Sequence, residues 1–226
     1  MILQALRRVA IAILLSTLGT GIASATLIDR GGGLIYDSAL NITWMQDAQY
    51  SITSGFNSAG RLNWQTANEW AAGVQYYDSE RGTTWGDWRL PSTINDPSSL
   101  GYDLGGINSE FAHLYYVDLG YAPNLAHDRF APAPTSGSYN PFVNMAYRGY
   151  WSSTPSNFPD QAWMFHFHFG STELNGIGDE QRVWLVRDGD VGAAAVPEPG
   201  MTGLLGLCLA GIGLVRRRRQ GRGQDA

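Results

Sequence analysis

The chain has a single cysteine and no lysine among its 226 residues. Cys208 lies in an apolar stretch near the C-terminus, so the region before it can form no disulfide and offers no thiolate nucleophile or cysteine metal site. The motifs G-x-S-x-G, H-E-x-x-H and G-x-x-x-x-G-K do not occur either. The sequence therefore lacks the local signatures of serine hydrolases, zinc proteases and P-loop nucleotide-binding proteins.

Positive charge is also scarce in the middle of the chain. Between Thr26 and Ala195, eight arginines accompany 18 acidic residues, which gives this part a formal charge of −10. Because such a region repels nucleic acid and anionic lipid, we expect neither of them as a partner. Its length of about 170 residues is enough for one domain that is stable through its own core, without disulfides.

Residues 1–25 have the features of a secretory signal peptide. Arg7 and Arg8 precede the apolar run "VAIAILLSTLGTGIASA", which ends in the small residues Ala23, Ser24 and Ala25. This order predicts export and cleavage after Ala25. A permanent N-terminal anchor is the alternative, but the run is short and its end is cleavable.

A second apolar segment, residues 201–215, lies near the C-terminus and is followed by four arginines, Arg216 to Arg219. As a helix, its 15 residues would measure roughly 22 Å, against roughly 30 Å for the hydrocarbon core of a bilayer. Bilayer thinning and snorkelling arginines can compensate for this mismatch. The positive-inside rule predicts that residues 201–215 form a transmembrane helix and that the basic tail 216–226 stays cytoplasmic.

The residues before this segment are Pro197, Glu198 and Pro199. Together, the Pro-Glu-Pro triplet, the Gly/Leu-rich span and the arginine cluster resemble a PEP-CTERM sorting signal. The resemblance implies processing by an exosortase, a membrane-embedded protease. It also implies export through the inner membrane to the cell surface or extracellular matrix of a Gram-negative bacterium with an exopolysaccharide or biofilm system. An ordinary single-span anchor is the alternative.

Two helices are predicted between these ends. In "NWQTANEWAAG", Asn63 can cap a helix and Gly73 can end it. In "NSEFAHLYYVDLG", Asn108 or Ser109 can cap a second helix, which Gly120 can end. The long segments between the predicted elements are rich in Gly, Pro, Asn and Asp, which is typical of ordered loops.

Strands are predicted on both sides of these helices. "LIYDSALNITWMQDA" predicts two short strands around a turn at residues 38–40, and "GYWSST", "AWMFHFHF" and "RVWLVRDGD" predict three more. Residues alternate between the two faces of a strand. In "AWMFHFHF" the aromatic residues therefore share one face, while the other face carries Met164, His166 and His168.

Residues 31–191 resemble the Lcl C-terminal domain, also known as DUF1566. The matching stretches are "GGGLIYDSALNITWMQDA", "GRLNWQTANEWAAG", "WGDWRLPS", "SEFAHLYYVDLG", "YWSST" and "RVWLVRDGDV". The resemblance implies an α+β domain of C-type-lectin-like architecture, as in formylglycine-generating enzymes, with two helices on a small, irregular antiparallel sheet. We expect this single domain to cover residues 26–192, with a linker and the Pro-Glu-Pro motif in residues 193–200.

The most specific stretch of that match is "GDWRLP", which contains Asp87, Trp88, Arg89, Leu90 and Pro91. An arginine beside a tryptophan is suited to binding a sugar or a carboxylate. Such an arginine more often pairs with a buried carboxylate, for which Asp87 is available, and stacking on an indole would add roughly 0.5–2 kcal/mol. We expect a structural role for these residues.

His166 and His168 have the H-x-H spacing that places two imidazoles on one face of a strand, as metal sites often require. A third ligand would have to come from His113, His127 or an acidic loop residue. The alternative, which we favour, is that the two histidines are ordinary surface residues.

Calcium is possible but has little support. The D-x-D pair Asp188 and Asp190 lacks the other ligands of an EF-hand loop, although Asp96, Asp103 or Asp179 could contribute to a loop site. No other cofactor is expected. Formylglycine-generating chemistry is excluded because it requires cysteines, which the region before residue 208 lacks.

These features favour an exported, noncatalytic binding module whose ligand is exopolysaccharide or another envelope component. Two alternatives remain. One is a secreted enzyme that acts on such polysaccharides, because a pair of glycosidase carboxylates leaves no local signature. The other is a purely structural matrix protein.

Overall fold

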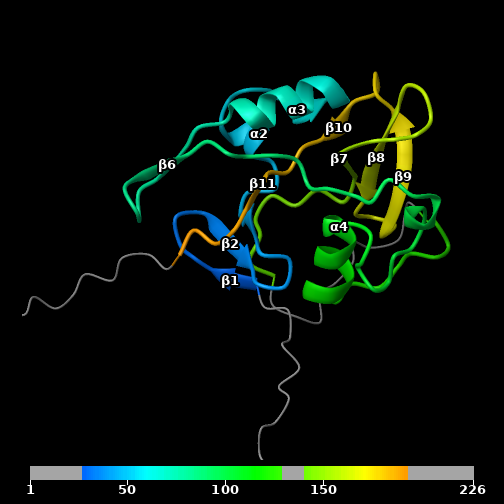
Figure 1. Cartoon of the computed structure of the whole chain (residues 1–226), viewed down its shortest axis with the longest axis horizontal. Helices are drawn as coiled ribbons and strands as arrows, with labels where there is room; N and C mark the ends of the chain where they lie inside the picture. The colour runs from blue at the N-terminus through cyan, green and yellow to red at the C-terminus, as the bar shows by residue number, and fades with distance from the viewer. Residues whose placement is uncertain (1–26, 129–139, 193–226) are drawn as a thin grey trace, which may run out of the picture.

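The computed structural model describes residues 27–128 and 140–192 (Figure 1). The predicted signal peptide, the Pro-Glu-Pro motif, the transmembrane segment 201–215 and the basic tail all lie outside the described residues. Within the described ranges, no helix has the length and apolar character needed to cross a membrane.

Short strands in the described ranges form three small sheets (Figure 1). The first has the order β1-β2-β3-β11 and comprises β1 (Leu27–Asp29), β2 (Leu34–Asp37), β3 (Ile42–Met45) and β11 (Val186–Asp188). The second has the order β4-β10-β7-β8-β9 and comprises β4 (Arg61–Leu62), β10 (Gln181–Arg182), β7 (Gly149–Pro155), β8 (Gln161–His166) and β9 (Ser171–Gly176). The third pairs β5 (Tyr76–Asp78) with β6 (Thr83–Trp85).

The β2–β3 hairpin confirms the two strands predicted around residues 38–40. Its strands are rich in β-branched and aromatic residues, which favour extended backbone. One carboxylate oxygen of Asp37 accepts hydrogen bonds from the amides of Ala39 and Leu40 at 3.0 and 3.1 Å, and Asn41 adopts a φ of 53°. The Asp37 side chain therefore stabilises the turn that sets the register of the hairpin.

The first predicted helix is α3 (Trp64–Gly73). As expected, the side chain of Asn63 caps it by accepting a hydrogen bond from the amide of Thr66 at 2.9 Å. The helix buries Ala67 and Ala71, which lie one turn apart on the face toward the core. A shorter helix, α2 (Tyr50–Thr53), precedes it, and a 3₁₀ turn, η1 (Pro97–Ser99), lies in the loop that follows β6.

The second predicted helix is present but is only partly α-helical. It begins as α4 (Glu110–Ala112), capped by Ser109 as expected, and continues as a π-helical turn, η2 (His113–Asp118). The amide of Leu119 donates to the carbonyl of Leu114 at 2.9 Å, which is the five-residue spacing of a π-helix. The apolar pattern of the sequence indicated a helix but carried no signal for this wider turn.

The last third of the chain departs further from the prediction. The polar strand β9 was missed, and "RVWLVRDGD" contributes to two strands, β10 and β11, which belong to different sheets. One pair, β10 with β7, is parallel, so the expectation of a single antiparallel sheet is wrong. The α+β class is confirmed, as a mixed structure with few short helices and several small sheets.

The core is built around the ring of Phe111 in α4, which is fully buried. Five aromatic rings surround it, with ring centroids 5.4–6.1 Å from its own. They belong to both large sheets and to the segments beside them: Trp44, Tyr150, Phe165, Phe167 and Trp184. This packing joins the helix to the two sheets without any disulfide, because residues 27–192 contain no cysteine.

Replacing this central ring should cost more stability than replacing an exposed one. We expect Phe111→Ala to lower the free energy of unfolding by about 3–5 kcal/mol, because it leaves a cavity between both sheets. Phe158→Ala is the control, since Phe158 is 57 % exposed, and its effect should stay within about 0.5 kcal/mol. Urea unfolding followed by tryptophan fluorescence measures both. Similar losses in the two variants would contradict the role given to Phe111.

Candidate functional site

A groove of about 490 Å³ opens on the five-stranded sheet. All five of its strands contribute residues, and two loop residues complete the wall. The groove is lined by Arg61, Arg148, Gly149, Met164, His166, Glu173, Leu174, Asn175, Glu180, Gln181 and Arg182. Most of these side chains are polar or charged, so the groove is suited to a hydrated, polar ligand.

The strand register brings arginines together in this groove. Arg182 of β10 lies directly opposite Arg61 of β4 in an antiparallel pair. Arg182 also pairs with Tyr150 of β7, and Arg148 lies just before the first residue of that strand. Like charges at directly opposite positions in a sheet destabilise it, so this arrangement has a cost that a bound anion would offset.

Arg61, Arg148 and Arg182 form no ion pair with any described residue. Their side-chain hydrogen bonds to described residues have neutral acceptors: Arg182 donates to Gln49 at 3.2 Å, and Arg148 donates to a backbone carbonyl. The other arginines of the described ranges each bind a carboxylate, in the pairs Arg30–Asp190, Arg81–Asp78, Arg89–Glu110, Arg89–Asp188 and Arg187–Asp87. Among the described residues, the arginines without an ion pair are thus the three that line the groove.

His166 lies at the end of β8 and contributes a neutral imidazole to the groove. Burial lowers the pKa of His166 below its ordinary value, although the charge of Glu173 partly opposes this. Its ring stacks on Phe169 with centroids 4.3 Å apart, and its buried Nδ1 has no hydrogen-bond partner in the described residues. Glu173, on the neighbouring strand, accepts a hydrogen bond from the hydroxyl of Ser171.

The "GDWRLP" stretch lies inside the fold and away from the groove. Trp88 and Leu90 are buried, and the Trp88 indole donates to the carbonyl of Trp85 at 3.0 Å. The backbone of Arg89 pairs with that of Val186 in an isolated bridge, at 2.8 and 2.9 Å. The stretch therefore joins the long loop to the last strand, which fits the structural role we expect for it.

Arg89, the arginine of this stretch, does not pair with Asp87, the partner that the sequence suggested. Arg89 binds both oxygens of Glu110 at 2.8 Å and reaches Asp188 at 2.7 Å. Burial alone would lower the pKa of Arg89, but the hydrogen bonds with Glu110 and Asp188 raise it. The sequence had suggested Asp87, which instead pairs with Arg187, and the resulting ion pair lowers the pKa of Asp87. That prediction is wrong because the tertiary structure supplies other partners: Glu110 of α4 and Asp188 of β11 reach Arg89, while Arg187 of β11 reaches Asp87.

Cation–π stacking in this region involves Arg187. Its guanidinium lies over the ring of Trp85, 4.3 Å from the centroid. Pro91 is held through its carbonyl, which accepts a hydrogen bond from the amide of Ser153 at 2.8 Å. Together these contacts hold the "GDWRLP" stretch and the residue before it against both large sheets.

His166 and His168 are not two surface residues on one face of a strand, which is the arrangement that we favoured. β8 ends at His166, the chain turns at residues 167–170, and His168 is 6 % exposed. Its Nε2 lies 2.9 Å from the carbonyl of Asp128, and the two histidine rings are 6.5 Å apart. The alternation read from the sequence thus fails beyond the end of the strand.

In residues 27–128 and 140–192, the group of three side chains close enough together to hold a metal ion does not include this pair. It consists of Asp37, His113 and Asp118. His113 was considered as a third ligand for the H-x-H pair but lies elsewhere, and His127 contacts Tyr102 at 2.9 Å.

The aspartates considered for calcium have protein partners. Asp188 and Asp190 bind Arg89 and Arg30, so arginines neutralise the D-x-D pair. Asp96 caps η1 through the amide of Ser98, and this bond contributes to lowering its pKa. Asp103 accepts from the amide of Asn108, and Asp179 is exposed beside Gly176.

No sequence motif indicated the groove arginines or the two aspartates, Asp37 and Asp118, that lie beside His113. One signal was available: with only eight arginines between Thr26 and Ala195, each one that lacks a nearby acidic partner is unusual. The pairing of Arg61 with Arg182, however, depends on a strand register that no local pattern encodes.

Two known protein families match parts of the chain. Residues 195–219 match the PEP-CTERM protein-sorting motif, which defines an exported, cell-surface protein processed by an exosortase. Residues 33–187 match the Lcl C-terminal domain, and the chain belongs to this family. Neither the curated proteins nor the solved structures gave a match.

Arg89→Met should destabilise the domain. It leaves Glu110, whose side chain is 14 % exposed, without its counter-charge. We expect a loss of about 2–3 kcal/mol, less than for a fully buried pair because the Arg89 side chain is 30 % exposed. In Arg61→Met, the exposed and unpaired control, stability should change by at most about 0.5 kcal/mol. Equal urea midpoints for Arg89→Met and wild type would refute the structural role.

His166 should make the domain less stable in mild acid. Its pKa is lowered in the folded state, so its contribution is fully present above the unfolded pKa of about 6.5 and declines as the pH falls through the folded pKa. His166→Gln should therefore lose less stability than wild type between about pH 7 and pH 5. Urea unfolding across this range measures the difference. A parallel decline in the two proteins would show that His166 does not contribute.

Proposed function

We propose that the exported domain is a noncatalytic binding module that holds an acidic polysaccharide of the cell surface or matrix in the arginine groove. The observation that carries this proposal is the gathering of Arg61, Arg148 and Arg182 in one groove, where none of them forms an ion pair with a described residue. Every other arginine of the described ranges is neutralised by a carboxylate.

The chemistry of these side chains supports an anionic ligand. Guanidinium groups bind carboxylates through paired, charge-assisted hydrogen bonds, which are stronger than neutral ones. The domain as a whole carries excess negative charge, so a polyanion is repelled everywhere except at a local cluster of arginines. A groove of this kind therefore selects where on the domain the polymer binds.

The remaining groove residues support a sugar in particular. Asn175 and Gln181 offer amide donors and acceptors, and Glu173 and Glu180 accept hydrogen bonds from hydroxyl groups. Gly149 keeps the floor open, since a Cβ there would meet the side chain of Gln181 and would lie 2.7 Å from Met164 Cε. Polymer hydroxyl and carboxylate groups would both find partners along this surface.

We also propose that the domain has the C-type-lectin-like architecture expected from the sequence. Two helical segments, α3 and α4–η2, accompany small irregular sheets, and a long ordered loop joins β6 to α4. In Figure 1, α3 and α4 lie on different sides of the strands. This arrangement supports a compact scaffold with binding surfaces built from loops and strand edges.

An enzyme is the second candidate, and one observation favours it. Glu173 and Glu180 line the same groove, so a polysaccharide bound there would contact two carboxylates, the residues that glycosidases use. We favour the noncatalytic module because the three arginines explain binding, whereas no described contact activates either carboxylate as an acid or a nucleophile.

Binding of the full chain to the exopolysaccharide of its own host tests the proposal. In Arg61→Gln/Arg182→Gln we expect about 100-fold weaker binding or more, because each of the two lost charge-assisted pairs contributes about 1.5 kcal/mol or more. Arg30→Gln is the matched control, with the same chemistry outside the groove, and should bind within about twofold of wild type. Added salt should weaken wild-type binding more than that of the double variant.

The other outcomes are equally informative. Equal binding by the double variant, or equal retention on a neutral glucan, would contradict the groove as the site. Shortening of the polymer that is abolished by Glu173→Gln or Glu180→Gln would establish the enzyme instead. Absence of any binding would leave the structural matrix role.

A further inference from the structure

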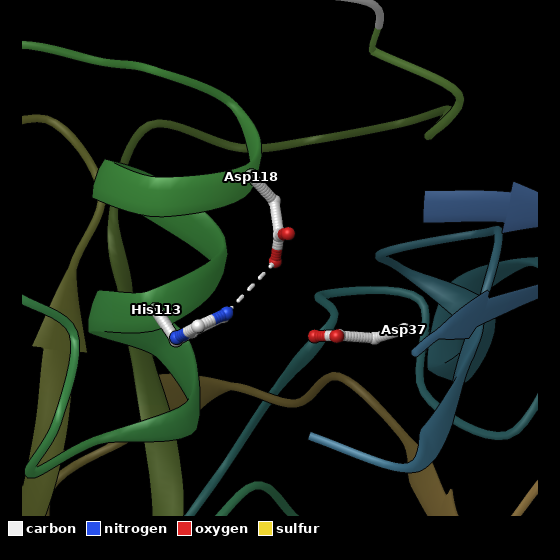
Figure 2. A group of neighbouring side chains, drawn as sticks. All are labelled: Asp37, His113 and Asp118. Atoms are coloured by element: carbon white, nitrogen blue, oxygen red, sulfur yellow. Dashed lines mark ion pairs between the residues drawn. The ribbon is translucent and has the colours of Figure 1, made fainter. Parts of the chain in front are cut away.

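Asp37, His113 and Asp118 bring one potential ligand atom each to within 4.8 Å of one another. His113 Nε2 lies 3.9 Å from Asp118 Oδ2. Figure 2 shows both of these side chains projecting from one helix toward Asp37, which approaches from the end of β2. The group lies apart from the arginine groove and shares no residue with it.

The π-helical turn is what brings two of these side chains together. His113 and Asp118 are its first and last residues. In an α-helix, with 3.6 residues per turn, residues five apart point in directions that differ by about 140°. A π-helical turn accommodates about one more residue, so here the two side chains lie close to one face. Such turns are rare and frequently occur at functional sites.

The candidate ligand atoms are buried and have no hydrogen-bond partner among the described residues. Asp37 is fully buried, as is the side chain of Asp118. In residues 27–128 and 140–192, no group donates a hydrogen bond to either oxygen of Asp118, and the same holds for Asp37 Oδ2 and His113 Nε2. Buried polar atoms without partners are costly, and carboxylates are the costliest among them.

The ring of His113 is oriented for coordination. Its Nδ1 lies 3.2 Å from the carbonyl of Gly106, which can only accept, so Nδ1 carries the proton and Nε2 presents its lone pair to the two carboxylates. Gly106 is required for this approach, because it has a φ of 61° and a Cβ there would lie 2.5 Å from His113 Cα. A backbone carbonyl behind the imidazole is the usual support of a metal-binding histidine.

We propose that Asp37, His113 and Asp118 bind a divalent transition-metal ion. One imidazole nitrogen with carboxylate oxygens is a donor set that suits Zn²⁺ or Mn²⁺, whereas calcium prefers oxygen ligands alone. The second oxygen of Asp37 already caps the β2–β3 turn, so the ion would find this ligand held in place.

The bound ion would act as a cross-link. Asp37 belongs to the N-terminal hairpin, and the other two ligands belong to the helix after the long loop. The region before residue 208 has no cysteine, so an exported domain of this composition has no disulfide with which to make such a link. Metal binding to a site that exists only in the folded state stabilises that state.

Metal content and thermal unfolding of the full chain test this proposal. After removal of metal with EDTA, we expect Zn²⁺ or Mn²⁺ to bind at one ion per chain. At a free concentration about 100-fold above Kd, the ion should raise the melting temperature by about 5–10 °C. Calcium at the same concentration should have much less effect. Asp118→Asn should weaken metal binding by at least about 100-fold and abolish the rise.

Three variants distinguish this site from its alternatives. Asp118→Asn should unfold no more easily than metal-free wild type, because asparagine has nearly the same shape and no charged form that is costly to bury, so its loss of metal would not reflect misfolding. Asp179→Asn, the same change at an exposed position, should bind metal like wild type. His166→Gln should also bind metal normally, since the H-x-H pair lies outside the group.

Two results would overturn the proposal. If neither Zn²⁺ nor Mn²⁺ changes the melting temperature of the stripped protein, the two carboxyl groups instead share a proton. If metal binding survives Asp118→Asn but is lost in His166→Gln, the ion belongs to the H-x-H pair.

Discussion

The packing around the ring of Phe111 sets the position of α4 and, through it, the positions of several charged side chains. Five aromatic rings from both large sheets and their connecting segments enclose it, so α4 can occupy only one position relative to those sheets. Its neighbours on the helix are then placed as well. Glu110 faces Arg89 and the amide of Ser92, while His113 faces the end of the N-terminal hairpin. A hydrophobic contact thus determines where charged groups meet.

The arginines of the domain fall into two groups: those that pair with carboxylates inside the fold, and those in the groove that form no ion pair. Arg89 is held between Glu110 and Asp188, and Arg187 between Asp87 and the ring of Trp85. These pairs join elements that are distant in the sequence and leave their charges neutralised. The groove arginines have no such partners, so the functional proposal rests on a difference between arginines within one domain.

Several features were predictable because their signals are local. A cap needs one side chain and the amides just after it, so Asn63 and Ser109 were identified correctly. The β2–β3 hairpin and the sorting motif likewise depend on contiguous residues. Strand β9 was missed because its sequence, STELNG, is polar and gains its stability from pairing with β8.

The sequence by itself determined the family, the sorting motif, the helix caps and the excess of negative charge, since each of these depends on neighbouring residues or on composition. Only the tertiary structure decided which charges meet. Arg89 binds Glu110 rather than Asp87, Arg61 faces Arg182, and Asp37 approaches the π-helical turn. Each outcome depends on strand register or helix geometry, which arise from burying the whole apolar surface at once and not from any short stretch of chain.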